Sequence, residues 1–227
     1  MNEKNKNTDF LWRIVEKHGK NLLFGVALLE EIDSKSADEI REIAKKMKYA
    51  VVIGHPVSRT VLQTITDKPN IIYKHHYQQL NWALDRIALE VSTIIESEGF
   101  RGLAIPASSI VDWEKQSGHF SHRHAAIAAG LAWMGRNGLA VTLRFGSQIR
   151  WASILTDIPL ECGSPIEMDC GECRACMEIC PANAISMIGC DVKKCYEKLS
   201  EFSKIQGVGQ HICGLCIKVC GGKSRWR

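Results

Sequence analysis

Cysteine is missing from the first 161 residues of this 227-residue chain, and all ten cysteines fall between Cys162 and Cys220. The chain also lacks an apolar run of about 20 residues, the length that spans a bilayer. Its first 20 residues contain neither the apolar core of an export signal nor a twin arginine. We therefore expect a cytoplasmic protein that makes no membrane contact, in a compartment that keeps thiols reduced.

No linker rich in Pro, Gly or Ser separates the cysteine-free part from the rest. A net charge of +4, with 45% hydrophobic and 24% charged residues, is ordinary for a soluble globular protein. The change in cysteine content predicts two domains, a cofactor-binding domain at residues 1–157 and a cysteine module at residues 158–227. The module is too small to build much of a core, so we expect bound metal to supply its folding energy.

The strongest motif is Cys170-x2-Cys173-x2-Cys176-x3-Cys180-Pro181, the spacing of bacterial 4Fe–4S ferredoxins. In two-cluster ferredoxins the fourth cysteine of this motif binds the other cluster. A second half-motif follows at Cys213, Cys216 and Cys220, with Cys195 upstream. The pattern predicts two 4Fe–4S clusters with crossed ligands. Cluster one takes Cys170, Cys173, Cys176 and Cys220, and cluster two takes Cys180, Cys195, Cys213 and Cys216.

Three alternatives remain at this point. A disulfide framework requires an oxidising compartment, and zinc favours paired CxxC elements with four ligands. A single cluster with spare thiols is the more serious alternative. Within the two-cluster reading, Cys190 competes with Cys195 as a ligand, and Cys162 is expected to be a structural thiol.

Hydrophobic periodicity and turn residues predict the order of elements. Helical spacing extends over residues 10–32, and a capping box from Ser36 to Glu39 opens a helix that ends near Lys48. A buried strand is expected at 49–53, a helix at 77–98 capped by Gly99, a strand at 102–105 and a helix at 121–134. Strands at 138–144 and 148–155 are expected to form a hairpin. This order predicts an α/β (α+β) fold.

Three segments carry a family resemblance: Ser121–Ala126 (SHRHAA), Ala129–Gly138 (AGLAWMGRNG), and Phe145–Ser147 (FGS) followed by Leu155–Asp157 (LTD). Together with the cysteines, they resemble the epoxyqueuosine reductases, relatives of the reductive dehalogenases. The resemblance implies a nitroreductase-like α/β domain that holds cobalamin beside two 4Fe–4S clusters. Electrons from the clusters would reduce the cobalt, which would reduce a substrate. A flavin such as FMN is the less favoured cofactor.

The resemblance also suggests site residues. Thr142, Leu155 and Thr156 would line the corrin. Gly135 would allow close backbone approach, and Asn137 would donate to a corrin amide or a phosphate. Apart from the resemblance, side-chain chemistry makes Asp112, His122 and His124 candidate proton donors to the reduced substrate, and cobalt ligation is the other option for the histidines.

Family enzymes that act on tRNA have a helical-repeat region after the clusters, and this sequence stops at Arg227. We therefore expect a short form that acts on a small molecule or a corrinoid protein rather than on tRNA. Its electrons would come from an external ferredoxin, flavodoxin or reductase. The competing hypothesis is an electron-transfer protein that has no substrate of its own.

Overall fold

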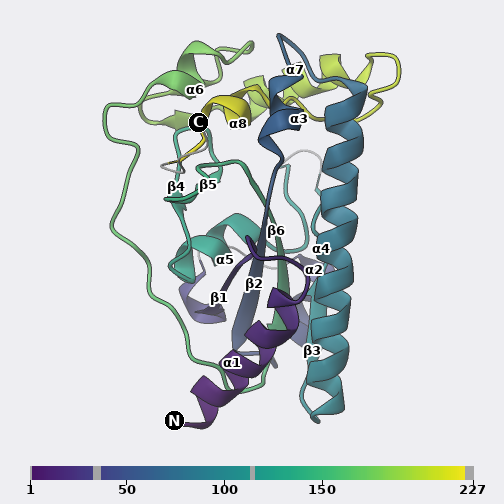
Figure 1. Cartoon of the computed structure of the whole chain (residues 1–227), viewed down its shortest axis with the longest axis vertical. Coiled ribbons are helices and arrows are strands. Elements are labelled where there is room, and N and C mark those ends of the chain that lie inside the picture. Colours follow the sequence, from purple (N-terminus) through teal and green to yellow (C-terminus); the bar gives the residue numbers. More distant parts are fainter. Residues whose placement is uncertain (1, 33–36, 113–115, 223–227) are drawn as a thin grey trace. The chain divides into compact units, whose positions relative to one another are not determined.

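The computed structural model describes residues 2–32, 37–112 and 116–222. The chain forms two compact units, and each is assembled from separate stretches (Figure 1). The first unit contains residues 1–55, 81–132 and 150–166, and the second contains residues 56–80, 133–149 and 167–227. The predicted domain boundary between residues 157 and 158 stays a prediction.

The first unit is built around a four-stranded sheet in the order β1-β2-β6-β3. Strand β1 (Leu23–Leu28) pairs antiparallel with β2 (Tyr49–Pro56), and β3 (Gly102–Ile105) pairs antiparallel with β6 (Ile149–Thr156). The last residue of β2 and the first residue of β6 belong to the second unit. The runs Val51–Ile53 and Ala152–Leu155 are almost completely buried, as expected for strands with both faces covered.

Two helices pack their apolar residues against this sheet. Helix α1 (Glu3–Glu16) contributes Leu11, Ile14 and Val15, and the long helix α4 (Ile71–Ser97) contributes a stripe that includes Leu84 and Val91. The remaining helical segments of this unit are η1 (Leu29–Glu31), α2 (Asp38–Ala44) and α5 (His122–Ala128). The spacing of the buried α4 residues is the helical period that the sequence predicted.

The second unit consists of short elements that are connected by loops. They are α3 (Arg59–Gln63), β4 (Trp133–Met134), β5 (Ala140–Val141), α6 (Ala175–Glu178), β7 (Ile185–Ser186), β8 (Gly189–Cys190), α7 (Val192–Ser203) and α8 (Leu215–Val219). The first residues of α4 also belong to this unit. Its apolar cluster of buried residues includes Leu62, Ile65, Tyr73 and Leu215.

Several predicted elements are confirmed. The strands at 49–53 and 102–105, the helix at 77–98 and its Gly99 cap are present, and Gly99 has a φ of +85°. The helix predicted after the capping box is present as α2, but its N-cap is Ala37, and Ser36 lies outside the described residues. The predicted α/β fold class is confirmed.

Other predictions are wrong. Residues 10–32 are not one helical segment, because α1 ends at Glu16 and β1 follows. The helix predicted at 121–134 ends at Ala128, where Gly130 at a φ of +73° forms a Schellman-type end and Trp133 enters a strand. The predicted hairpin of 138–144 with 148–155 does not form. Strand β5 pairs with β4, and β6 joins the main sheet.

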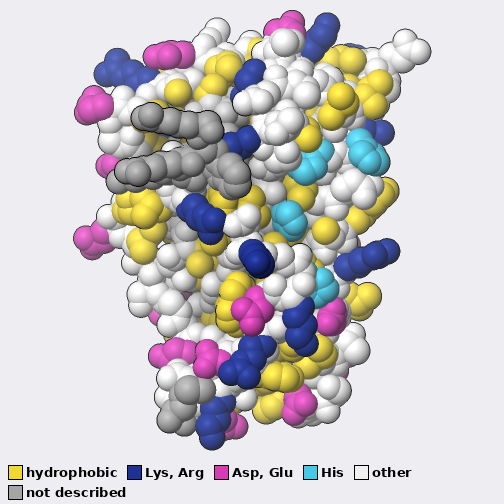
Figure 2. Space-filling model, in the orientation of Figure 1, with side chains coloured by type: hydrophobic (Ala, Val, Ile, Leu, Met, Phe, Trp, Pro, Cys, Tyr) yellow, Lys and Arg dark blue, Asp and Glu magenta, His cyan; other side chains and the backbone are white. Residues whose placement is uncertain are grey.

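Within the described residues, no helix is both long enough and apolar enough to cross a bilayer. On the face that Figure 2 shows, acidic and basic side chains are interspersed with hydrophobic ones. This distribution agrees with the small net charge of the whole chain.

Candidate iron–sulfur centre

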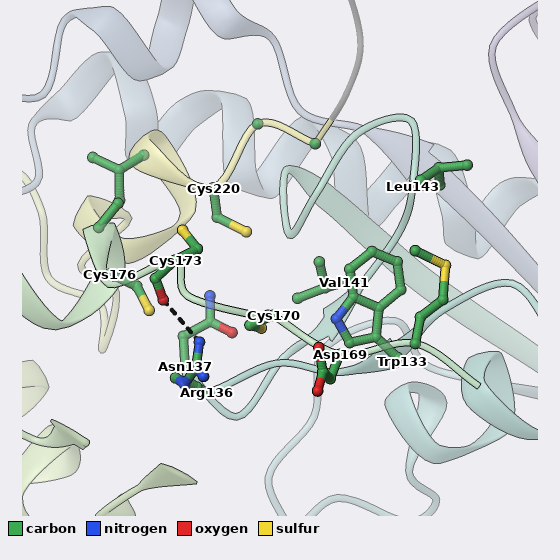
Figure 3. Close-up of a pocket in the computed structure, with 15 residues that line it drawn as sticks. Trp133, Arg136, Asn137, Val141, Leu143, Asp169, Cys170, Cys173, Cys176 and Cys220 are labelled. Atoms are coloured by element: carbon green, nitrogen blue, oxygen red, sulfur yellow. Dashed lines mark hydrogen bonds between the residues drawn. The ribbon is translucent and has the colours of Figure 1, made fainter. Parts of the chain in front are cut away.

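Four of the predicted cluster ligands line one cavity of about 290 Å³ in the second unit, namely Cys170, Cys173, Cys176 and Cys220. Figure 3 shows these side chains gathered on one side of the cavity. Asp169 shapes the loop that carries the first of them, because its carboxylate accepts a hydrogen bond of 2.7 Å from the amide of Gly171. These are the four cysteines that the crossed assignment gives to cluster one.

Cys220 is distant from the other three cysteines in sequence, and residues elsewhere in the second unit hold the loop that carries it. The amide of Ser147 donates to the Cys220 carbonyl at 3.1 Å, and the Arg59 guanidinium donates to the Gly221 carbonyl at 2.6 Å. A side chain at Gly146 would place its Cβ only 2.1 Å from the Cys220 carbonyl oxygen. The FGS motif therefore positions Cys220, the predicted crossed ligand, and glycine is required at its centre.

The electrostatic interactions in the first cavity link the same four cysteines. The pKa of Cys176 is raised chiefly by burial and then by the nearby thiolates of Cys220, Cys170 and Cys173. Crowded thiols of this kind are poorly stable as anions unless cationic metal compensates them. The cavity is therefore suited to a metal cluster that neutralises four thiolates.

The second cysteine group lines a separate cavity of about 40 Å³ in the same unit, and it consists of Cys180, Cys190, Cys195, Cys213 and Cys216. Four of these five are the predicted ligands of cluster two. The amide of Ala184 donates to the Cys180 sulfur at 3.4 Å. Cys195 lies in the first turn of α7, where Asp191 caps the helix by accepting from the amide of Lys194.

Cys190 is the fifth thiol of this group, on the strand just before that cap. A hydrogen bond with Cys190 lowers the pKa of Cys195, whereas burial and the thiolates of Cys213 and Cys180 raise the pKa of Cys216. This hydrogen bond places Cys190 directly beside Cys195 in the same group. The choice between the two stays a prediction.

Among the described residues, no three His, Cys, Asp or Glu side chains are placed to hold a single metal ion. Ligands of a cubane cluster surround a body of four irons, so their sulfurs line a cavity instead of meeting at a point. Cys162 belongs to the first unit, packs against its core and lines neither cavity.

The first cavity extends beyond its cysteines to a wall formed by Trp133, Val141 and Leu143 (Figure 3), and Met168 also lines the cavity. Trp133 is 9% exposed, and its Nε1 donor is buried without a hydrogen-bond partner. An unsatisfied buried donor is costly, so it points to an acceptor that would occupy the cavity. Arg136 fixes the opposite rim by donating to the Cys173 and Gly171 carbonyls at 2.8 and 2.6 Å.

Sequence reasoning did not single out these supporting residues. Trp133 and Arg136 lie inside the AGLAWMGRNG segment, where an aromatic and a cation among small residues are the available signal. Arg59 lies in α3, and nothing in its local sequence indicates its contact with Gly221.

The residues predicted to hold a corrin are divided between the two units: Gly135, Asn137 and Thr142 belong to the second, and Leu155 and Thr156 belong to the first. Asn137 lines both cysteine cavities, and a Cβ on Gly135 would lie 2.4 Å from Val141. The Thr142 hydroxyl accepts from the amide of Phe145 at 3.0 Å inside the FGS loop. Leu155 and Thr156 are fully buried in β6, and Thr156 accepts from the amide of Ile158. Their roles at a corrin stay predictions.

The predicted proton donors lie in the first unit. His122 has both ring nitrogens engaged, Nδ1 with the Ser153 hydroxyl and Nε2 with the Pro106 carbonyl, each at 2.9 Å. Burial lowers its pKa to about 4, so the ring is neutral at pH 7. His124 Nδ1 lies 2.7 Å from the Ser121 hydroxyl, and Asp112 forms an isolated bridge with Ser117. Their catalytic roles stay predictions.

No family model matches the chain. Among curated proteins, the epoxyqueuosine reductase of Bacillus anthracis is 33% identical over 125 residues, which cover 51% of this chain and 32% of that protein. The epoxyqueuosine reductase of Aliivibrio fischeri is 29% identical over 198 residues, which cover 80% of this chain and 49% of that protein. In these two matches, the chain accounts for at most about half of its relative's length.

Solved structures show the same fold. A catabolic reductive dehalogenase superposes with a TM-score of 0.74 at 19% identity, covering 96% of this chain and 32% of that one. The epoxyqueuosine reductase of Streptococcus thermophilus superposes with a TM-score of 0.59 at 17% identity, covering 93% and 64%. These likenesses, with the curated relatives, confirm the resemblance that the sequence predicted.

Proposed function

We propose that this chain, a member of the superfamily of epoxyqueuosine reductases and reductive dehalogenases, is an iron–sulfur oxidoreductase that passes single electrons through two 4Fe–4S clusters to a corrinoid. The corrinoid would reduce an organic substrate. Members of the superfamily differ in substrate: one solved relative is a B12-dependent reductive dehalogenase, and another was solved with an epoxyqueuosine-modified tRNA stem loop.

One observation carries this proposal. The eight cysteines that the motif spacing assigned to two crossed clusters line two separate cavities, and each predicted set of four falls together. Cys220 completes the first set of four across 44 residues of chain from Cys176, so Cys180, Cys195, Cys213 and Cys216 remain as a second set of four that lines a cavity of its own. Two clusters therefore account for the arrangement better than one cluster with spare thiols does.

We infer that the wall of the first cavity beyond its cysteines contacts one edge of an organic electron acceptor next to cluster one. Its far wall is apolar at Val141 and Leu143 and carries the unpartnered Trp133 donor. A corrin has apolar edges and peripheral amides, so its amide oxygen would satisfy Trp133 while the aliphatic side chains cover its edge. When bound, the corrin supplies the metal centre at which the substrate bond is reduced.

The protein's own residues position and shield this chemistry. Arg136 holds the CxxC loop and places a positive charge beside the cluster-one ligands, which favours the reduced, more negative cluster. An external electron donor, a ferredoxin, a flavodoxin or a reductase, would supply electrons, and the substrate would be a small organic molecule.

Anaerobic reconstitution with iron, sulfide and cobalamin tests the proposal. After desalting, about eight irons per chain, a 4Fe–4S spectrum and retained cobalt are expected. The same protein reconstituted with FMN in place of cobalamin is the matched control, and it should lose the flavin on desalting.

Other outcomes would redirect the proposal. About four irons would refute the two-cluster assignment. Eight irons without cobalt would instead favour an electron-transfer protein that delivers electrons to a partner, and retained FMN would favour a flavin in the same cavity.

A further inference from the structure

Asn137 lines both cysteine cavities, and among the described residues it alone belongs to both linings. On one side it faces the cavity of Cys170, Cys173, Cys176 and Cys220, and on the other the cavity of the second cysteine group. The residue is 7% exposed. Figure 3 shows its amide directed toward the cysteines of the first cavity. Asn137 thus forms part of the wall between the two proposed cluster sites.

The amide is held in this wall by hydrogen bonds on both of its ends. Nδ2 donates to the Ser147 hydroxyl at 3.1 Å, and Oδ1 accepts from the amide of Leu139 at 3.3 Å. Ser147 in turn donates its backbone amide to the carbonyl of Cys220. The GRN and FGS segments are therefore joined in one network that ends at a ligand of cluster one.

We propose that Asn137 is a positioning residue for electron transfer between the two clusters: its buried, neutral amide separates them and sets the reduction potential of both. This inference rests on the proposed two-cluster function. A reduced cluster is more negative than an oxidised one, so any charge in the shared wall acts on both sites. A neutral side chain there keeps each reduction favourable, and a tightly packed wall excludes water from the path between the clusters.

Two substitutions test the proposal in opposite directions. Asn137→Asp adds a negative charge of nearly the same shape, and at pH 9 even a buried carboxyl is largely ionised. Asn137→Ala opens the wall to water, which stabilises the more negative reduced clusters. The readout is a potentiometric titration followed by electron paramagnetic resonance, with iron counted in every sample.

At a fixed potential, we expect Asn137→Asp to lower the ratio of reduced to oxidised cluster about tenfold at both sites. For a one-electron couple, this corresponds to a fall in reduction potential of about 59 mV. Asn137→Ala should raise the same ratio for both clusters. Control substitutions change charge in one cavity only. Lys198→Gln lies in the second lining and should shift cluster two alone, and Asp169→Asn lies in the first and should shift cluster one alone.

The outcomes are decisive. A shift confined to one cluster, or no shift with about eight irons retained, would overturn the proposal. Loss of iron from both Asn137 variants would assign the residue a purely structural role and would also overturn it. The wild-type iron count is read first, so failure of the two-cluster function is seen before any variant is compared.

Discussion

Replacing Gly146 with alanine should remove cluster one and leave cluster two in place. Gly146 has a φ of +60°, and an alanine Cβ would lie 2.1 Å from the Cys220 oxygen and 2.6 Å from its carbonyl carbon. Carbon–oxygen contacts need well over 3 Å, so the Cys220 segment must move by about 1 Å or more. A cluster ligand displaced this far cannot bind with normal geometry.

The matched control is Gly209→Ala, because Gly209 has a φ of +57° and no atom within 4 Å of its added Cβ. Both variants bear the same left-handed backbone cost, roughly 1–2 kcal/mol, and only Gly146→Ala bears the collision. Iron analysis after anaerobic reconstitution should give about four irons for Gly146→Ala and about eight for Gly209→Ala. Eight irons in both variants would refute the argument that the FGS loop positions Cys220.

Three further predictions follow from the same structure. Cys195→Ser should lose about four irons whereas Cys190→Ser keeps about eight; the reverse result would make Cys190 the ligand. His122, whose pKa falls from 6.5 to about 4 on folding, stays neutral in the fold while the unfolded chain takes up a proton, so stability is lost as pH falls from 6.5 toward 4. Between pH 7.5 and 5, denaturant titration should show that the free energy of unfolding falls by about 2 kcal/mol more in the wild type than in His122→Gln. Equal losses would contradict the lowered pKa of His122. Trp133→Phe should keep its iron but bind cobalamin roughly fivefold more weakly in equilibrium dialysis, the effect of one hydrogen bond, and unchanged binding would remove Trp133 from the site.

Local sequence predicted the parts of the fold that depend on local physics. The α4 stripe, the Gly99 cap and the buried β2 strand follow from periodicity and backbone freedom within a few residues. The two errors at strand β1 and at the expected hairpin have a common cause. Leu23–Leu28 and Ala140–Val141 become strands through partners that local pattern does not specify, β2 for the first and β4 for the second.

The cysteine grouping was predictable for a different reason. Ligand spacing in a cluster motif is set by the geometry of the metal group, so it encodes a long-range contact in a local pattern. For this reason the motif spacing alone assigns Cys220 to the first group. Arg59 and Ser147 hold Cys220 there by donating to backbone carbonyls. Every residue has a backbone carbonyl, so the sequence does not indicate which carbonyl accepts these hydrogen bonds.

These contacts change the interpretation of the segments that carry the family resemblance. The resemblance implied that Asn137 and Thr142 contact a corrin, whereas their observed hydrogen bonds run to Ser147, Leu139 and Phe145. A network that begins at the GRN segment, passes through FGS and ends at the Cys220 carbonyl braces the segment that carries a predicted cluster ligand. If that bracing is its main role, substitutions in the FGS segment should change iron content, and substitutions in either segment should change cluster potentials, before they change cobalamin affinity. Measuring these three quantities on one set of variants separates the two roles.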